Sequence, residues 1–178
     1  MYPYASYVTV NISSPNTEGL RELQEGAALE NLLGTLKAEQ AKLSQRHRRY
    51  VPLVVKIAPD LSTTEIKLIA AMLMQYKIDG VIATNTTVDR RKVAGQVHAA
   101  EEGGLSGRPL KDKATAVIRI LAKALDGSMP IIGVGGIMSG ADAAEKIAAG
   151  ATLVQIYTGL IYKGPELVVE IAEALAPT

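Results

Sequence analysis

The segment from Asn11 to Thr17 gathers side chains that can both donate and accept hydrogen bonds. Two amides, Asn11 and Asn16, and two hydroxyls, Ser13 and Ser14, lie within six consecutive positions. Ser, Pro and Asn also form turns and cap helices, so a purely structural role is one interpretation. The other is that this loop binds a small polar molecule, because amides and hydroxyls match carbonyl and N–H groups.

Lys56 interrupts the apolar run Val54-Val55-Lys56-Ile57-Ala58. An ammonium in the interior of a strand is costly to bury without an anionic or carbonyl partner. Either the side chain extends outward to water or it serves a ligand.

A second group of polar side chains, Thr84, Asn85 and Thr86, follows the apolar run 80–83. Residues 86–107 then show little periodicity, and loops of this length inside compact domains are usually functional or mobile. The segment ends in Gly103-Gly-Leu-Ser-Gly-Arg-Pro109, whose glycines allow the backbone to approach a ligand closely.

Two further glycine-containing turns are Ile132-Gly-Val-Gly-Gly-Ile137 and Tyr157-Thr-Gly159. Backbone N–H groups at such turns, leading into helices, suit a phosphate. Two turns after the last two strands match the phosphate site of many (β/α)8 barrels. The basic cluster Arg46–Arg49 is interpreted as a helix end, where cations are favoured.

Composition narrows the function classes. The 178 residues carry a net charge of +1, which gives no electrostatic reason to expect a nucleic acid. There is no Cys and there are only two His, so thiolate chemistry and a zinc-type site are excluded. No stretch approaches the roughly 20 apolar residues of a membrane span, and no signal peptide is apparent. We therefore expect a soluble, intracellular chain with an organic cofactor.

The elements that must position these residues are five buried strands, at 7–12, 53–58, 80–83, 131–134 and 153–157. Apolar residues at helical spacing lie between them, and Ser62-Thr-Thr-Glu65 is a capping box. This βα order predicts a parallel sheet, either an open five-stranded sheet or the C-terminal five units of a (β/α)8 barrel. Polar or glycine residues at the end of every strand favour the barrel.

Six motifs resemble one known family. NISSPNT, VKIAPD, VIATNT, GGLSGRPL, IIGVGGI and LVQIYTG occur in the order and with the gaps of the C-terminal half of the quinone-linked (class 2) dihydroorotate dehydrogenases. The resemblance spans residues 7–172. It implies an FMN-containing barrel that oxidises dihydroorotate to orotate in pyrimidine biosynthesis and passes electrons to a quinone.

The resemblance also implies roles for individual residues. Ser14 would be the catalytic base. The cytosolic class uses Cys there, so a chain without Cys points to the class bound peripherally to the cytoplasmic side of the inner membrane. The implied FMN contacts are Asn11, Lys56, Thr84, Gly107, Gly136, Tyr157 and Thr158, and the implied orotate contacts are Asn11, Asn16, Asn85 and Thr86.

On this interpretation, residues 1–178 form a single domain that lacks the first three strands of the barrel and the N-terminal helices that dock to the membrane and admit quinone. The chain alone is then expected to be an inactive fragment. Two alternatives stay open. One is another FMN barrel acting on a dihydropyrimidine ring, and the other is a non-catalytic half-barrel that associates with itself.

Overall fold

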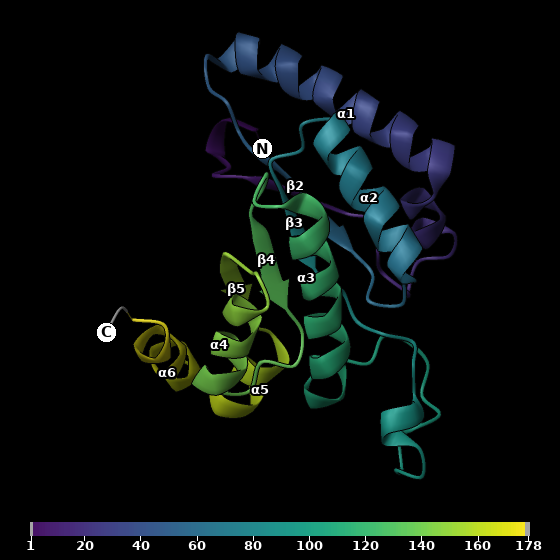
Figure 1. The fold of residues 1–178 in the computed structure, drawn as a ribbon, viewed down its shortest axis with the longest axis vertical. Coiled ribbons are helices and arrows are strands. Elements are labelled where there is room, and N and C mark those ends of the chain that lie inside the picture. The colour runs from purple at the N-terminus through teal and green to yellow at the C-terminus, as the bar shows by residue number, and fades with distance from the viewer. Residues whose placement is uncertain (1, 177–178) are drawn as a thin grey trace.

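A computed structural model describes residues 2–176 (Figure 1). The sheet comprises β1 (Val8–Asn11), β2 (Leu53–Ile57), β3 (Gly80–Ala83), β4 (Ile131–Val134) and β5 (Leu153–Gln155). The helices are α1 (Gly26–His47), α2 (Thr63–Gln75), α3 (Lys111–Leu125), α4 (Gly140–Ala148), α5 (Thr158–Lys163) and α6 (Glu166–Ala174). The predicted alternation of strands and helices is confirmed.

Three details differ from the sequence-based expectation. β1 is one residue shorter at each end, and β2 ends at Ile57, one residue earlier than predicted. β5 ends at Gln155 because Tyr157 is the N-cap of the additional short helix α5. The loop after β1 contains a 3-10 helix, Leu20–Gln24. The segment 86–107 is anchored at its base by an antiparallel bridge between Thr87 and Leu105.

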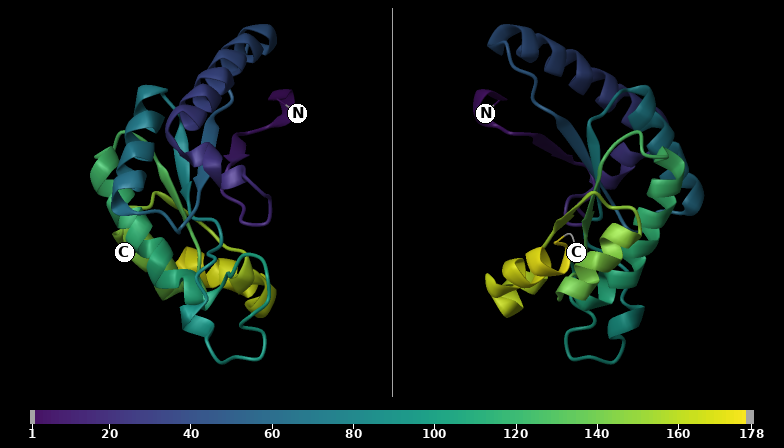
Figure 2. Two further views of the ribbon diagram at one scale, coloured as in Figure 1. Left: turned by 90° about the vertical axis from the view of Figure 1, so that its right-hand side faces the viewer. Right: turned by 60° about the vertical axis from the view of Figure 1, so that its left-hand side comes forward.

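The five strands are parallel and lie in the order β1-β2-β3-β4-β5. A doubly wound sheet would reverse its strand order at a switch point, whereas a (β/α)8 barrel keeps the strands in chain order. Helices α1 to α4 follow one face of the twisted sheet (Figure 2). This is the architecture of the C-terminal part of a barrel, with β1 and β5 as open edges.

Alternate residues of the strands face two different environments. On the outer face, Val55 and Ile57 are fully buried in a core shared with α1, α2 and α3. On the inner face a smaller cluster forms from Val54, Ile82, Ile132 and Val134. Lys56 belongs to this inner face by the same alternation.

The helix ends are built as the sequence predicts. The capping box at Ser62 is complete: the Ser62 amide donates to Glu65 Oε2 at 2.6 Å and the Glu65 amide to Ser62 Oγ at 3.3 Å. Arg46 and His47 form the last turn of α1, and Arg49 donates to the carbonyls of Pro3 and Ala5. The structural interpretation of the basic cluster is therefore confirmed. Within residues 2–176, no helix is long and apolar enough to cross a membrane.

Candidate active site

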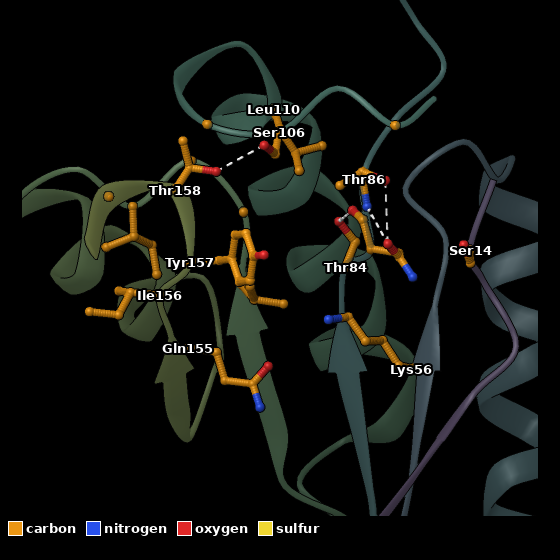
Figure 3. Close-up of a pocket in the computed structure, with 18 of the residues that line it drawn as sticks. Ser14, Lys56, Thr84, Thr86, Ser106, Leu110, Gln155, Ile156, Tyr157 and Thr158 are labelled. Atoms are coloured by element: carbon orange, nitrogen blue, oxygen red, sulfur yellow. Dashed lines mark hydrogen bonds between the residues drawn. The ribbon is translucent and has the colours of Figure 1, made fainter. Parts of the chain in front are cut away.

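The carboxyl ends of the strands surround a cavity of about 440 Å³ (Figure 3). Ten of the predicted site residues line it: Ser14, Asn16, Lys56, Thr84, Asn85, Thr86, Gly107, Gly136, Tyr157 and Thr158. They come from the loops or ends of all five strands, so the expected ring of polar groups at one mouth is present. Asn11 lies beside the cavity and reaches it through Asn85.

Asn11, Ser13 and Asn85 form a hydrogen-bonded cluster between the loops after β1 and β3. Asn11 Oδ1 accepts from Ser13 Oγ and from Asn85 Nδ2, each at 3.0 Å. Asn85 Oδ1 in turn accepts from the Thr86 amide at 2.8 Å. Two residues 74 positions apart are thus fixed relative to each other, and with them the polar wall of the cavity.

Ser14 is half-buried at one side of the cavity, opposite Tyr157 in Figure 3. Its Oγ accepts a hydrogen bond from the Asn16 amide at 3.2 Å. Among residues 2–176 no carboxylate or imidazole is hydrogen-bonded to this hydroxyl. A serine that removes a proton here would need a relay beyond the hydroxyl itself, since its own basicity at neutral pH is low.

Lys56 is half-buried, and its ammonium turns toward the cavity (Figure 3). Burial lowers the pKa of this lysine. No carboxylate within residues 2–176 lies within 4.0 Å of Nζ. The side chain therefore offers a positive charge to the cavity.

The opposite end of the cavity is formed by backbone. Gly136 has a φ of +74°, and a Cβ at this position would lie 2.5 Å from Lys111. Only glycine fits, which leaves the backbone at the turn after β4 accessible from the cavity. Across from it, Thr158 Oγ1 donates to Ser106 Oγ at 2.8 Å, which joins the start of α5 to the long segment after β3.

Comparison with known proteins decides the family. The model of the dihydroorotate dehydrogenase family matches residues 1–178. The chain belongs to the dihydroorotate dehydrogenase family. Among curated relatives, the dihydroorotate dehydrogenase (quinone) of Nitrosospira multiformis is 60% identical over 174 residues, covering 98% of this chain. That of Aeromonas salmonicida is 63% identical over 171 residues, covering 96%.

Solved structures agree. The dihydroorotate dehydrogenase of Eimeria tenella in complex with ferulenol superposes with a TM-score of 0.91 at 38% identity, over 97% of this chain and 50% of that chain. The ligand-free form gives a TM-score of 0.90. The chain spans about half the length of the curated relatives it matches, 50% for Nitrosospira and 51% for Aeromonas.

Several residues that line the cavity were not singled out from the sequence. Gln155 is the last residue of β5, two positions after Leu153 on the inner face. The signal that identified Lys56, a polar residue that interrupts an apolar run, was present for Gln155 in Leu153-Val-Gln-Ile-Tyr157 as well. Ser106 and Leu110 lie in or next to the glycine-rich segment 103–109 and had no such signal.

Proposed function

We propose that the full-length protein containing this chain oxidises dihydroorotate to orotate with bound FMN and passes the electrons to a quinone, as a step of pyrimidine biosynthesis. The observation that carries this proposal is the convergence of Ser14, Lys56 and Asn85 on one cavity. The family match favours this activity over other FMN barrels. The "quinone" in the relatives' names supports a peripheral location on the cytoplasmic side of the inner membrane.

The cavity suits FMN by the chemistry of its walls. Gly136, which cannot carry a side chain, together with Tyr157 and Thr158 would hold the phosphate through backbone N–H groups and a hydroxyl. Lys56 would lie near the flavin ring, where its charge favours the reduced form. Thr84, Gly107 and Asn11 would complete the set of contacts.

When bound, FMN supplies a hydride acceptor for C6 of the substrate. On the substrate, Ser14 would accept the proton from C5, so that a hydride and a proton together leave dihydroorotate. Asn11, Asn16, Asn85 and Thr86 would hold the ring, because amides and a hydroxyl can pair with its carbonyl and N–H edge. The rate should rise with pH, as expected for a weak hydroxyl base.

The isolated chain should behave differently from the full-length protein. Its two edge strands expose unpaired backbone groups, and Leu153 on the inner face is 57% exposed. Unpaired strand edges and exposed apolar faces tend to associate with other chains. We infer that the isolated chain lacks activity, holds FMN weakly or not at all, and associates with itself, most economically as a symmetric dimer.

Two preparations test both statements. The first is the 178-residue chain, and the second joins it to the remaining half of the Nitrosospira relative, called here the full-length enzyme. Size-exclusion chromatography with light scattering, monitored at flavin absorbance, should show a yellow full-length enzyme and a colourless, self-associated chain. Dihydroorotate should bleach the flavin of the former only. A yellow, active, monomeric chain would contradict the half-barrel interpretation, and a full-length enzyme that dihydroorotate leaves oxidised would contradict the proposed activity.

A further inference from the structure

The guanidinium of Arg21 lies between three loops at the mouth of the cavity without lining the cavity itself. Arg21 belongs to the 3-10 helix that follows the Ser14 loop. Its Nε donates to the carbonyl of Ser13 at 3.1 Å, and its NH2 group donates to the carbonyl of Thr86 at 3.0 Å. Its NH1 group pairs with Asp60 Oδ2 at 3.1 Å. All three guanidinium nitrogens are thus used, each toward a different loop.

Asp60, at the end of the VKIAPD motif, holds this guanidinium in place. The same carboxylate accepts from the Val88 amide at 3.0 Å, from Lys113 Nζ at 2.8 Å and from the Thr87 hydroxyl. Burial raises the pKa of Asp60, but the hydrogen bonds from Lys113, Thr87 and Val88 outweigh it and keep the pKa below its usual value. The carboxylate is therefore ionised at neutral pH and anchored from the side of β3 and α3.

The two carbonyls that accept from Arg21 belong to residues that position the wall of the cavity. Ser13 directly precedes Ser14, and Thr86 is itself a cavity residue beside Asn85. A planar fork that joins both carbonyls sets the distance between the two loops, because each N–H direction is fixed by the guanidinium. A lysine has one compact ammonium and cannot reproduce the three directions.

We propose that Arg21, oriented by Asp60, is a positioning residue that fixes the loop of Ser14 against the segment of Asn85 and Thr86. The inference rests on the proposed function, since the geometry it protects is that of proton removal from dihydroorotate. Misplacement of a reacting group by about 1 Å can cost a hundredfold in rate.

The test uses the full-length enzyme with Arg21→Lys, and with Arg91→Ala as control. Arg91 lies farther along the segment after β3 and is also paired with a carboxylate, Asp89, but its side chain is 86% exposed. Within residues 2–176 its side chain donates no hydrogen bond to Ser13, Ser14, Asn85 or Thr86. Stopped-flow reduction of the flavin by dihydroorotate gives the saturating rate and the substrate Kd separately. Flavin content, thermal midpoint and reduction by dithionite are measured on the same samples.

We expect Arg21→Lys to lower the saturating rate by about tenfold or more, with flavin content, thermal midpoint and dithionite reduction kept at parental values. Arg91→Ala should react at the parental rate. A parental rate for Arg21→Lys, or a slower rate matched by equal losses of flavin and thermal stability, overturns the inference. If Arg21→Lys does not fold, Asp60→Asn is judged by the same criteria, with an expected loss of about threefold to tenfold. If dihydroorotate does not reduce the parent at all, the proposed function itself fails.

Discussion

The two faces of the sheet differ in how fully their side chains are buried. On the outer face, Val55 and Ile57 are fully buried beneath the helices. On the inner face, Lys56 is half-buried beside a cavity, and Leu153 remains 57% exposed on the edge strand β5. The side chains that stabilise the fold therefore lie on one face, and those that could carry the chemistry lie on the other.

This difference follows from the architecture. In a closed barrel the outer face is covered by the helices that each strand brings with it, so a contiguous run of βα units can bury that face alone. The inner face is covered by strands on the far side of the barrel. The chain spans about half of its relatives, so we expect substitutions on the two faces to behave differently in the isolated chain and in the full-length enzyme.

The largest effect is expected at Ser14. In the full-length enzyme, Ser14→Ala should slow flavin reduction by dihydroorotate by about 10²- to 10⁴-fold, the usual contribution of a general base. Substrate binding should be largely kept, because the proposed ring contacts are assigned to other residues. Stopped-flow reduction at several pH values measures both, with Ser44→Ala on α1 as control. An alanine variant that reduces at the parental rate would remove Ser14 from the mechanism.

Ser14→Cys sharpens the same assignment. A thiol has a pKa of about 8.5 and loses its proton far more readily than a serine hydroxyl. The cysteine variant should therefore keep activity with a pH optimum shifted downward. An unchanged optimum would mean that a group other than residue 14 sets the pH dependence.

A pair of leucine substitutions compares the two faces directly. Leu73→Ala in α2 removes a fully buried side chain from the outer core. It should lower the free energy of unfolding by about 2–5 kcal/mol in both the chain and the full-length enzyme. Leu153→Ala should lower the free energy of unfolding of the chain by less than about 1 kcal/mol at protein concentrations where the chain is monomeric, because the side chain is then largely exposed.

In the full-length enzyme the remaining strands should bury Leu153, and the cost should rise to about 2 kcal/mol or more. Urea unfolding at several protein concentrations measures these free energies and separates self-association from folding. Equal small costs for Leu153→Ala in both preparations would mean that the inner face is not closed by the other half.

Lys56→Ala separates binding from folding on the inner face. Removing the ammonium should weaken FMN retention by about tenfold or more, because its charge is expected to meet the flavin. The thermal midpoint of the flavin-free protein should change little. Dialysis against buffer and flavin absorbance give the first quantity, and unfolding with and without FMN gives the second. Equal destabilisation in both states would make Lys56 a structural residue.

The strands, their parallel order and the polar groups at their carboxyl ends could be predicted from the sequence because they depend on local signals. The assignment of ten individual cavity residues came from the family resemblance. An apolar run followed by Thr84 and Asn85, or a capping box at Ser62, is visible within a few positions. The Arg21 network was not visible in this way. Arg21 and Asp60 are 39 positions apart, and Arg21 and Thr86 are 65 apart. Only the parallel order of the strands brings the loops of Arg21, Asp60 and Thr86 together. No local sequence signal in those loops predicts that these residues are hydrogen-bonded to one another.

Lys146 in α4 provides the outer-face counterpart of Lys56. It is fully buried, and Nζ donates to the Lys111 carbonyl at 2.8 Å and to Thr115 Oγ1 at 2.5 Å. No carboxylate within residues 2–176 lies within 4.0 Å of this ammonium. Burial lowers the pKa of Lys146 to about 8. Unlike Lys56, Lys146 is enclosed by groups of the chain itself. Its charge therefore destabilises the folded state and is not accessible to a ligand.

The cost of Lys146 depends on pH in a defined direction. In the unfolded chain a lysine has a pKa of about 10.4. Below about pH 8 the lysine is protonated in both states, and the folded state bears the full penalty. Between about pH 8 and 10.4 the folded protein releases the proton first, so the penalty disappears and this group makes the protein more stable as the pH rises.

Lys146→Met should therefore raise the free energy of unfolding of the chain at pH 7 by about 1–3 kcal/mol, because one pKa unit corresponds to about 1.4 kcal/mol and two hydrogen bonds are lost in exchange. Thr115 Oγ1 donates to the Lys111 carbonyl at 3.0 Å, so these two groups keep a partner when the ammonium is removed. The advantage of the methionine variant should shrink toward pH 10. Urea unfolding at pH 7, 9 and 10 measures it, with the exposed Lys67→Met in α2 as a control that should show no such trend. A methionine variant less stable than the parent at pH 7 would mean that the hydrogen bonds of Lys146 outweigh its burial, and that the outer face tolerates a charge as readily as the inner one.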